Sequence, residues 1–521
     1  MQNQGLLLRI PDKLLFWLLW LIHLLPVWMF TPFPTVDGPA HLYNARLMLE
    51  LWRGNPTVSE FFVLNPLLQP NVLGHVLLAG MMALGLPALL AEKLLLTTLV
   101  GLLPLAFRRL IRSLNPDAGD VALLVFPFVY GFLFFMGLYN FLLGLVMLLF
   151  GIEKWINLVG KAVNRRDASV LIVVALLTLY AHLYAFVWFL VFTALVLMAD
   201  RFGKEKSLTN KQMAIKILVW GLPLLPALYH IIRGKFSGGD TVFASPSALW
   251  DLIYQVQPAK GLEYGKANIY TQWLFWLLVL RLAVSVYEAI KKGLRPETTL
   301  LRMSFLLLSI ALFALPDGTA LSGMVSQRTG LLWFFSLLAL LAAIPAHSWL
   351  RWTSRAVALV VCLSLLWLYN GTLKREQTVA RSVALAARSI PAGAVVYVEN
   401  TSSQMLNTHV SNYLGAGRPL IVSENYQAAL PYFPVGWNLR NLPVLHLGEM
   451  SKHVKAWPVA GGLRNLRAAY VLVISDGSSD PATEGILDKQ HYFRGLYELI
   501  YQDQAKRVSL FRALPLSIYD L

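Results

Sequence analysis

The residues best suited to chemistry lie near the N-terminus, in a polar segment that follows the first apolar run. Residues 31–46 read Thr-Pro-Phe-Pro-Thr-Val-Asp-Gly-Pro-Ala-His-Leu-Tyr-Asn-Ala-Arg, and the side chains of interest are Asp37, His41, Tyr43, Asn44 and Arg46. The Asp37 carboxylate could act as a general base, with the other groups binding a polar substrate beside it. Alternatively, Asp37 caps the helix that Pro39 begins, because Asp shortly before Pro is a common helix start. One carboxylate can do both, so both roles stand at this point.

The composition indicates what must position these residues. Of 521 residues, 57% are hydrophobic and 14% are charged, whereas soluble domains carry roughly 25% charged residues. Several apolar runs reach the ~20 residues that cross about 30 Å of hydrocarbon, which predicts a polytopic α-helical membrane protein. The first run has no small-residue cleavage site, so we expect it to stay as a span. Cys362 is the sole cysteine, which excludes a disulfide within the chain.

Basic residues gather in six short clusters between the apolar runs. The clusters are Arg9 and Lys13; Arg108, Arg109 and Arg112; Lys154, Lys161, Arg165 and Arg166; those within 201–216; those within 291–302; and Arg351 and Arg355. Short loops rich in Lys and Arg stay in the cytoplasm, so an even number of spans must separate neighbouring clusters. Because the positive charge belongs to these loops, the net charge of +16 does not favour a nucleic-acid partner.

This parity rule predicts eleven spans, with a cytoplasmic N-terminus and an outer C-terminus. The apolar runs 121–153 and 169–199 must each be a tight hairpin, turning near 137–140 and near 181–184. The expected spans are 13–30, 88–107, 120–136, 140–156, 168–182, 184–200, 214–232, 270–290, 299–315, 330–348 and 356–371.

Two regions fall outside these spans. Residues 31–87 form a long first outer loop with amphipathic, interfacial helices, one after Asp37 and one over 71–86. Residues 372–521 have shorter apolar runs and predict an extracytoplasmic α/β domain, so the chain divides into a transmembrane module, 1–371, and this domain. Strand patterns cover 394–398, 420–422, 469–474 and 508–511, and helical patterns cover 377–388, 404–414 and 482–496.

Further candidate residues map to the outer ends of the spans or to the first outer loop. They are His75, His182, His230, the hairpin-tip pair Tyr139 and Asn140, and Arg328, which enters a span from the outer side. Ionisable groups at membrane depth are costly and usually functional. A guanidinium such as Arg328 suits a phosphate because it offers a planar fork of donors, although an arginine there can also simply reach toward lipid headgroups. No His-x3-His or His-Glu pair occurs, so we expect no divalent metal.

The string Val-Asp-Gly-Pro-Ala-His-Leu-Tyr-Asn-Ala, at 36–45, resembles the opening of several bacterial branches of the type C (GT-C) glycosyltransferase superfamily. The order of one span, a long outer loop with an early Asp, many further spans and an outer α/β domain is similar as well. The resemblance implies an integral membrane glycosyltransferase whose donor is a sugar on polyprenyl phosphate, with Asp37 as the general base. Many members carry a second acid in the next outer loop, where this chain has Gly137-Leu138-Tyr139-Asn140, so metal-independent chemistry is expected.

The function expected on these grounds is inverting transfer of a sugar from a polyprenyl-phosphate lipid to a glycan, lipid or protein acceptor. The bacterial inner membrane is the expected location, with residues 372–521 in the periplasm or outside the cell. A lipid-linked oligosaccharide ligase or polymerase would share this topology and donor. A lipid or solute transporter would instead place charges near the midplane in matching halves, and a scaffold or sensor would have no need of Asp37.

Overall fold

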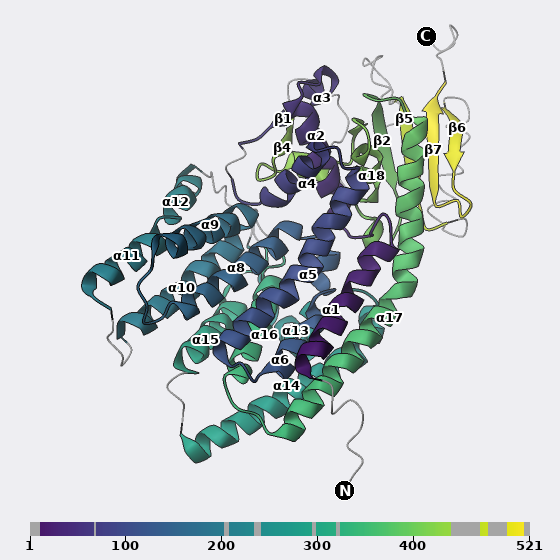
Figure 1. Cartoon of the computed structure of the whole chain (residues 1–521). Helices are drawn as coiled ribbons and strands as arrows, with labels where there is room; N and C mark the ends of the chain where they lie inside the picture. The colour runs from purple at the N-terminus through teal and green to yellow at the C-terminus, as the bar shows by residue number, and fades with distance from the viewer. Residues whose placement is uncertain are drawn as a thin grey trace. The chain divides into compact units, whose positions relative to one another are not determined.

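The computed structural model describes residues 11–66, 69–202, 208–233, 241–293, 298–318, 323–438, 469–477 and 497–514. The backbone divides into two compact units, whose elements are labelled in Figure 1. Unit 1 comprises Met1–Pro26, Thr97–Phe135 and Tyr139–Thr372, and unit 2 comprises Val27–Leu96, Met136–Leu138 and Leu373–Leu521. Unit 2 therefore combines the predicted first outer loop with the predicted C-terminal domain. The predicted division at residue 371 separates these two regions.

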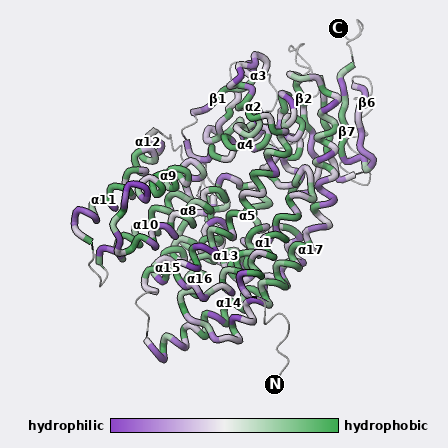
Figure 2. Tube along the Cα trace, in the orientation of Figure 1, coloured by the Kyte–Doolittle hydropathy of each residue, from purple (hydrophilic) through white to green (hydrophobic). Residues whose placement is uncertain are grey.

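Unit 1 is helical. Its elements are α1 (Asp12–Met29), α5 (Ala88–Leu114), α6 (Gly119–Leu123), η2 (Phe126–Phe128), α7 (Phe132–Phe135), α8 (Tyr139–Asn157), α9 (Arg165–Ala181), α10 (Leu183–Phe202), α11 (Asn210–Gly221), α12 (Leu224–Arg233), α13 (Pro246–Tyr254), η3 (Gln257–Ala259), α14 (Tyr264–Lys292), α15 (Thr299–Ala314), α16 (Val325–Ala342) and α17 (Ser348–Ala386). Parts of α1, α5 and α17 belong to unit 2. Hydrophobic positions predominate along the long helices (Figure 2).

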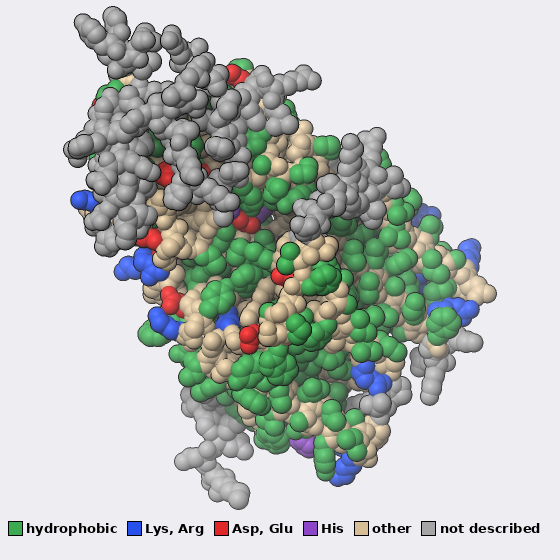
Figure 3. All heavy atoms as spheres, turned by 180° about the vertical axis from the view of Figure 1, so that it is seen from behind, with side chains coloured by type: hydrophobic (Ala, Val, Ile, Leu, Met, Phe, Trp, Pro, Cys, Tyr) green, Lys and Arg blue, Asp and Glu red, His purple; other side chains and the backbone are tan. Residues whose placement is uncertain are grey.

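Eight helical stretches among the described residues are long and apolar enough to cross a membrane. Exposed apolar side chains run along single helix faces, at Leu14, Leu18, Leu21 and Leu25 of α1 and at Ile269, Trp273 and Trp276 of α14. Their spacing of three or four residues places each set on one stripe. Such stripes are unfavourable in water and suit contact with lipid. The face drawn in Figure 3 likewise carries broad areas of hydrophobic side chains. The protein is thus a multi-pass helical membrane protein.

Each predicted span coincides with helical structure, but not every one is a long helix. The segment predicted as a span at 120–136 is divided among α6, η2 and α7. Helices α9 and α15, which cover the predicted spans 168–182 and 299–315, have 17 and 16 residues. At the other extreme, α17 has 39 residues. Its length of about 58 Å is nearly twice the hydrocarbon thickness, so this helix must continue beyond the apolar layer.

The helix breaks expected at the two hairpin tips are present. Helix α7 ends at Phe135 and α8 begins at Tyr139, while only His182 separates α9 from α10. Helices α8, α9 and α10 pack against one another in unit 1 (Figure 1). The α8–α10 approach depends on Gly151, because a Cβ there would lie 2.2 Å from the Phe189 ring.

Buried ion pairs join helices within unit 1. The Arg281 guanidinium in α14 donates to Asp120 at 2.5 Å, and Lys216 in α11 pairs with Asp200 in α10. Removing one member of such a pair would leave an uncompensated buried charge and should be strongly destabilising. The first pair connects helices that are distant in the sequence, and the second connects two consecutive helices.

Unit 2 contains a five-stranded mixed sheet. Its strands are β2 (Val395–Asn400), β3 (Ile421–Val422), β5 (Tyr470–Ile474), β6 (Tyr497–Gln502) and β7 (Val508–Ala513), in the order β3-β2-β5-β7-β6. Strands β3, β2 and β5 are parallel, and β7 runs antiparallel to both its neighbours. The four predicted strands are therefore confirmed as β2, β3, β5 and β7. Strand β6 was not predicted.

Among the helices predicted at the C-terminal end of the chain, one is wrong and one lies outside the described residues. Residues 404–414 form two 3₁₀ turns, η6 (Met405–Asn407) and η7 (Val410–Asn412), followed by the single-turn helix α18 (Tyr413–Ala416). The pattern at 377–388 is the last part of α17 and the turn η5 (Ala387–Ser389). The predicted helix at 482–496 is not covered.

The predicted first outer loop packs into the same unit. It forms α2 (Gly38–Trp52), α3 (Pro56–Phe61), β1 (Phe62–Leu64) and α4 (Leu73–Ala83). Strand β1 pairs antiparallel with β4 (Val435–Trp437), so Phe62 lies opposite Trp437. Twelve of the fifteen α2 residues are buried, which corrects the expectation of an amphipathic interfacial helix after Asp37. Helix α2 is instead a core element that packs against α4 and α18.

Candidate functional site

The Asp37 side chain does not cap α2. Its backbone is helical, at φ −91° and ψ −12°, and the carboxylate makes no capping hydrogen bond. The helix begins through the Asp37 carbonyl, which accepts from the His41 amide at 3.0 Å. The capping alternative is therefore not realised, and the carboxylate contacts other side chains instead.

A tight turn holds the Asp37 backbone in place. The Asp37 amide donates to the Met136 carbonyl at 3.2 Å, and His41 makes a hydrogen bond with the backbone of Gly137. Gly137 has φ +76°, and a Cβ there would lie 2.7 Å from the Asp37 nitrogen. Only glycine fits both this left-handed conformation and this close approach.

The Asp37 carboxylate faces two side chains from the C-terminal part of unit 2. Its Oδ1 atom lies 3.7 Å from Nε2 of His409, and the carboxylate also interacts with the Tyr426 hydroxyl. The Tyr426 ring stacks on the His409 imidazole, with ring centroids 4.1 Å apart. The Asp37 side chain is 15% exposed, so the group is largely shielded yet still reachable.

A second carboxylate lies on the other side of His409. The Nδ1 atom of His409 is 2.5 Å from Oε1 of Glu424, and Oε2 of Glu424 accepts from Ser411 at 2.5 Å and from Asn412 at 2.6 Å. His409 thus stands between two acids, Asp37 and Glu424. Burial lowers its pKa, but the charges of Glu424 and Asp37 more than offset this, so the pKa of His409 lies above its ordinary value.

The residues of this arrangement follow two parallel strands. His409 lies in the segment after β2, and Glu424 and Tyr426 come directly after β3. Because β2 and β3 are parallel, their carboxyl ends meet at one edge of the sheet. The carboxyl edge of parallel strands is where ligands commonly bind in open sheets of α/β proteins.

A neutral polar network adjoins this group. His41 Nδ1 lies 2.9 Å from His75 Nε2, and Gln427 bonds both rings, at 3.2 Å and 3.1 Å respectively. Burial and the neighbouring His75 hold the pKa of His41 well below its ordinary value, and burial lowers the pKa of His75 to about 4. Both imidazoles are therefore neutral near pH 7. Asn44 joins the network through Asn425 at 2.9 Å and Gln427 at 3.1 Å.

Two of the predicted binding residues on α2 have other contacts. The Tyr43 hydroxyl donates to the Leu420 carbonyl at 2.5 Å and accepts from the Val422 amide, so it fastens α2 to β3. Arg46 forms an ion pair with Glu50 at 2.9 Å. At about 100° per residue, Arg46 lies on the face of α2 opposite Asp37. Neither side chain belongs with the Asp37 carboxylate.

The remaining predicted residues lie in unit 1. Arg328 of α16 is 8% exposed and lies over the Phe141 ring at 5.7 Å, which does not fit an arginine that reaches outward to headgroups. His182 contacts the same Phe141 ring and is close enough to Arg328 to feel its charge. Tyr139 and Asn140, just before Phe141 in α8, are both buried.

The described contacts of His230, in α12, do not connect it with the group around Arg328. Its ring neighbours are Tyr180 and Tyr229, and its side chain is half-buried. The group of Arg328, His182 and Phe141 is completed by a 2.5 Å hydrogen bond between Tyr184 and Thr329.

Sequence reasoning missed His409, Glu424, Tyr426 and Gln427. A usable signal was present, since the polar run Ser423-Glu-Asn-Tyr-Gln427 directly follows a buried strand pattern. It also missed Glu92, a buried carboxylate in α5 that accepts from the Tyr413 hydroxyl at 2.9 Å. Among the described residues, no group of three or more His, Cys, Asp and Glu side chains is arranged to hold a metal.

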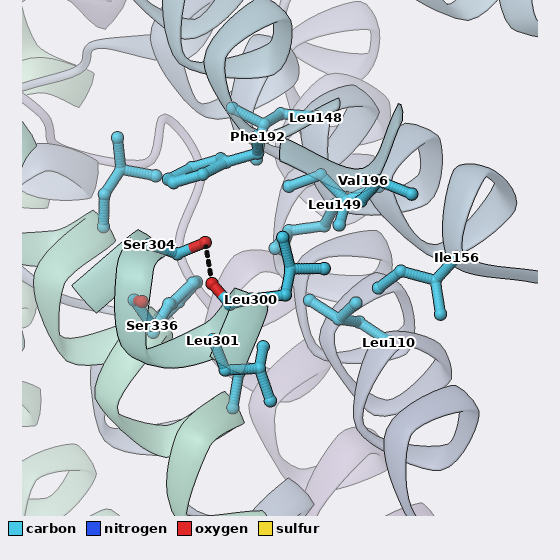
Figure 4. A pocket seen from close by; sticks show the side chains of 14 residues that line it. Leu110, Leu148, Leu149, Ile156, Phe192, Val196, Leu300, Leu301, Ser304 and Ser336 are labelled. Carbon is cyan, nitrogen blue, oxygen red and sulfur yellow. Dashed lines mark hydrogen bonds between the residues drawn. The ribbon is translucent and has the colours of Figure 1, made fainter. Parts of the chain in front are cut away.

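A separate pocket in unit 1 is lined by apolar side chains from α5, α8, α10, α15 and α16, together with Ser304 and Ser336 (Figure 4). The Ser304 hydroxyl donates a hydrogen bond to the Leu300 carbonyl at 3.0 Å. The lining holds no titratable group, so this pocket cannot supply acid or base chemistry.

Comparison with known proteins adds no identity to this picture. No known family profile matches the chain, and no characterised protein matches it significantly in sequence.

Proposed function

We propose that the protein is an inverting glycosyltransferase that moves a sugar from a polyprenyl-phosphate lipid to an acceptor on the outer face of the membrane. The observation that carries the proposal is the orientation of Asp37. Its carboxylate does not cap the helix and instead faces His409 and Tyr426, which are hydrogen-bonded in turn to Glu424 and to Gln427. The resemblance of 36–45 to type C glycosyltransferases, and the many apolar helices, support a lipid-linked donor.

The reaction follows from the chemistry of such donors. Asp37 takes the proton of the acceptor hydroxyl as that oxygen attacks the anomeric carbon. The bond from this carbon to the phosphate oxygen breaks through an oxocarbenium-like state, and attack from the opposite face inverts the centre. Polyprenyl phosphate leaves with the bonding electrons, and the acidic proton stays on Asp37 until solvent removes it.

The departing phosphate gains charge and needs a cation to stabilise it. Arg328 is our proposed phosphate ligand, because a buried guanidinium offers paired donors that match phosphate oxygens. This assignment rests on its chemistry and on its own surroundings in unit 1. Arg46, on α2, is the other arginine that could bind the phosphate, but it already forms an ion pair with Glu50.

The location proposed with this function is a bacterial inner membrane, with the Asp37 group on the periplasmic side. Outside the cytoplasm no nucleotide sugars are supplied, so a membrane lipid must bring the sugar. We expect no divalent metal in the reaction.

The test uses purified full-length protein in nanodiscs. It is incubated with a panel of polyprenyl phosphates carrying hexose, N-acetylhexosamine or pentose, together with an envelope extract from cells that lack the gene. Mass spectrometry should detect release of polyprenyl phosphate and gain of one sugar by an envelope component. Asp251→Asn, a change on the exposed face of α13, is the matched control for Asp37→Asn. Movement of the intact donor between leaflets, without release of polyprenyl phosphate, would indicate a transporter and refute the proposal.

A further inference from the structure

The buried Glu424 carboxylate is surrounded by hydrogen-bond donors. The residue is 5% exposed, and its two carboxylate oxygens take three short hydrogen bonds, from His409, Ser411 and Asn412. A buried charge is tolerated only when it is paired and hydrogen-bonded, and here one short segment supplies all three donors. The segment 409–412 is therefore built around this carboxylate.

Glu424 in turn fixes the orientation of His409. The 2.5 Å contact at Nδ1 places the proton on that nitrogen, facing the acid, and turns Nε2 toward Asp37. Tyr426 covers one face of the ring, so the imidazole cannot rotate without losing both the stacking contact and the Glu424 bond. The ionisable groups that face His409 are Asp37, Glu424, Tyr426 and, at longer range, His41.

The distance from His409 to Asp37 suits an ionic contact more than a full hydrogen bond. At 3.7 Å, an imidazolium still stabilises a carboxylate. Catalytic hydrogen bonds are often long in the absence of substrate.

We propose that His409 is a positioning residue for Asp37, held as an imidazolium by Glu424, and that it keeps the base ionised and correctly turned. This proposal rests on the proposed transfer reaction. It adds His409 and Glu424, which lie outside the polar segment 31–46 that contains Asp37. Glu424 acts one step further away, through His409. No proton passes to His409, because an imidazolium has no free site for one.

The pH dependence follows from the charges. Loss of the imidazolium removes the cation beside Asp37, so its carboxylate becomes protonated at higher pH. The acidic limb of the rate profile should then move upward in pH. The alkaline limb should reflect neutralisation of His409, whose pKa is raised from its ordinary value by the charges of Glu424 and Asp37.

The experiment compares wild type with His409→Gln, Glu424→Gln and the control Glu498→Gln, an exposed acid on β6. Donor turnover is measured from pH 5 to 9, with kcat and KM separated. We expect His409→Gln to lower kcat about 10- to 100-fold with little change in KM, and to shift the acidic limb upward. Glu424→Gln should do the same more weakly, and the control should match wild type.

A purely structural role would give a different result. A lowered melting temperature, with kcat and the pH profile of the folded fraction unchanged, would overturn the proposal. Full activity of His409→Gln at all pH values would do so as well, while leaving the proposed transfer reaction intact.

A second readout does not depend on turnover. NMR of ¹⁵N-labelled histidine, with His409 assigned through His409→Gln, reports whether the ring stays charged above pH 7. Asp37→Asn and Glu424→Gln should each lower its titration point. If His409 titrates in this way but no donor is consumed, the transfer reaction is refuted, while the ionic contacts of His409 with Asp37 and Glu424 are supported. A neutral His409 at pH 6 would overturn the arrangement.

Discussion

His409 Nε2 lies 3.7 Å from Asp37 Oδ1, although one residue follows the first membrane helix and the other lies beyond the last. Both belong to unit 2, where the carboxyl ends of β2 and β3 bring the C-terminal residues to the start of α2. The contact brings the segment after the first membrane helix and the C-terminal region into one candidate site. The following predictions test that site and its setting.

Asp37→Asn should abolish glycosyl transfer and leave folding nearly unchanged. An amide cannot take a proton, and loss of a general base typically costs ~10²–10⁴-fold in rate. The wild-type side chain makes no capping hydrogen bond, so no cap is lost. Donor turnover and thermal unfolding should be measured on the same sample. Transfer at the wild-type rate would exclude Asp37 as the base.

Arg328→Ala should weaken binding of a polyprenyl-phosphate donor, and Arg328→Lys should do so to a smaller degree. Lysine keeps the charge but loses the planar fork of donors. Donor affinity is best measured by binding of a fluorescent polyprenyl phosphate to protein in nanodiscs. Arg302→Ala, at a partly exposed position near the start of α15, is the control. Unchanged affinity of Arg328→Ala would require another phosphate ligand.

Cysteine labelling should show opposite sides for the C-terminal region and the α8–α9 loop. Ser403 and Lys161 are both exposed, and the native Cys362 is buried, so background reaction should be low. With an impermeant thiol reagent added to intact cells, Ser403→Cys should react and Lys161→Cys should react only after lysis. The reverse pattern would invert the predicted topology.

Gly151→Ala should destabilise unit 1 by about 1–3 kcal/mol, the usual range for overpacking a core. The added methyl would meet the Phe189 ring at 2.2 Å and push α8 away from α10. Gly371→Ala in α17 is a matched control, because nothing lies within 4 Å of its Cβ position. That change should be neutral or slightly stabilising, since alanine favours helix. Equal melting temperatures for both variants would contradict the close packing.

Acidification should destabilise unit 2 between about pH 6.5 and pH 4. His75 has a pKa of about 4 in the folded protein, and the pKa of His41 is also lowered. An unfolded chain binds protons at these rings from about pH 6.5 downward, so stability present at neutral pH is lost as the pH falls. Each ring contributes up to about 1.4 kcal/mol per pH unit.

His75→Gln should flatten this pH dependence, at the cost of lower stability at pH 7. The relevant measurement is chemical or thermal unfolding at several pH values, followed by a probe attached within unit 2. His409 works in the opposite direction, because its raised pKa adds stability that is lost as the pH rises. A steeper acid loss in His75→Gln than in wild type would contradict the assignment.

The helical framework was predictable because local patterns determine it. Apolar length and basic loops located the helices, and the parity of those loops located the breaks beside Gly137 and at His182. The sequence pattern could not show that residues 120–136 form three short helical elements, because the composition of this segment matches that of a continuous span. Nor could it show that α2 is buried on nearly all sides, because this depends on what packs around it.

The site was only partly predictable for a related reason. Asp37, His41 and Asn44 share one face of α2 through spacings of four and three residues, which the sequence displays directly. Their partners His409 and Glu424 are brought close by the pairing of β2 with β3, a long-range contact that no local pattern records. Arg46 failed as a partner because helical geometry turns it away from Asp37 and toward Glu50.

The three-residue ladder between β1 and β4 has a consequence for biosynthesis. Strand β1 is made early, but β4 leaves the ribosome only after all the membrane helices have been synthesised. Until then α2, twelve of whose fifteen residues are buried in the folded unit, lacks its packing against α18 and β4. A chain truncated before β3 would retain its membrane helices yet lack Glu424, one of the two acids beside His409. The site can therefore form only after the membrane helices have been synthesised, and termination before β3 should give an inserted but inactive product.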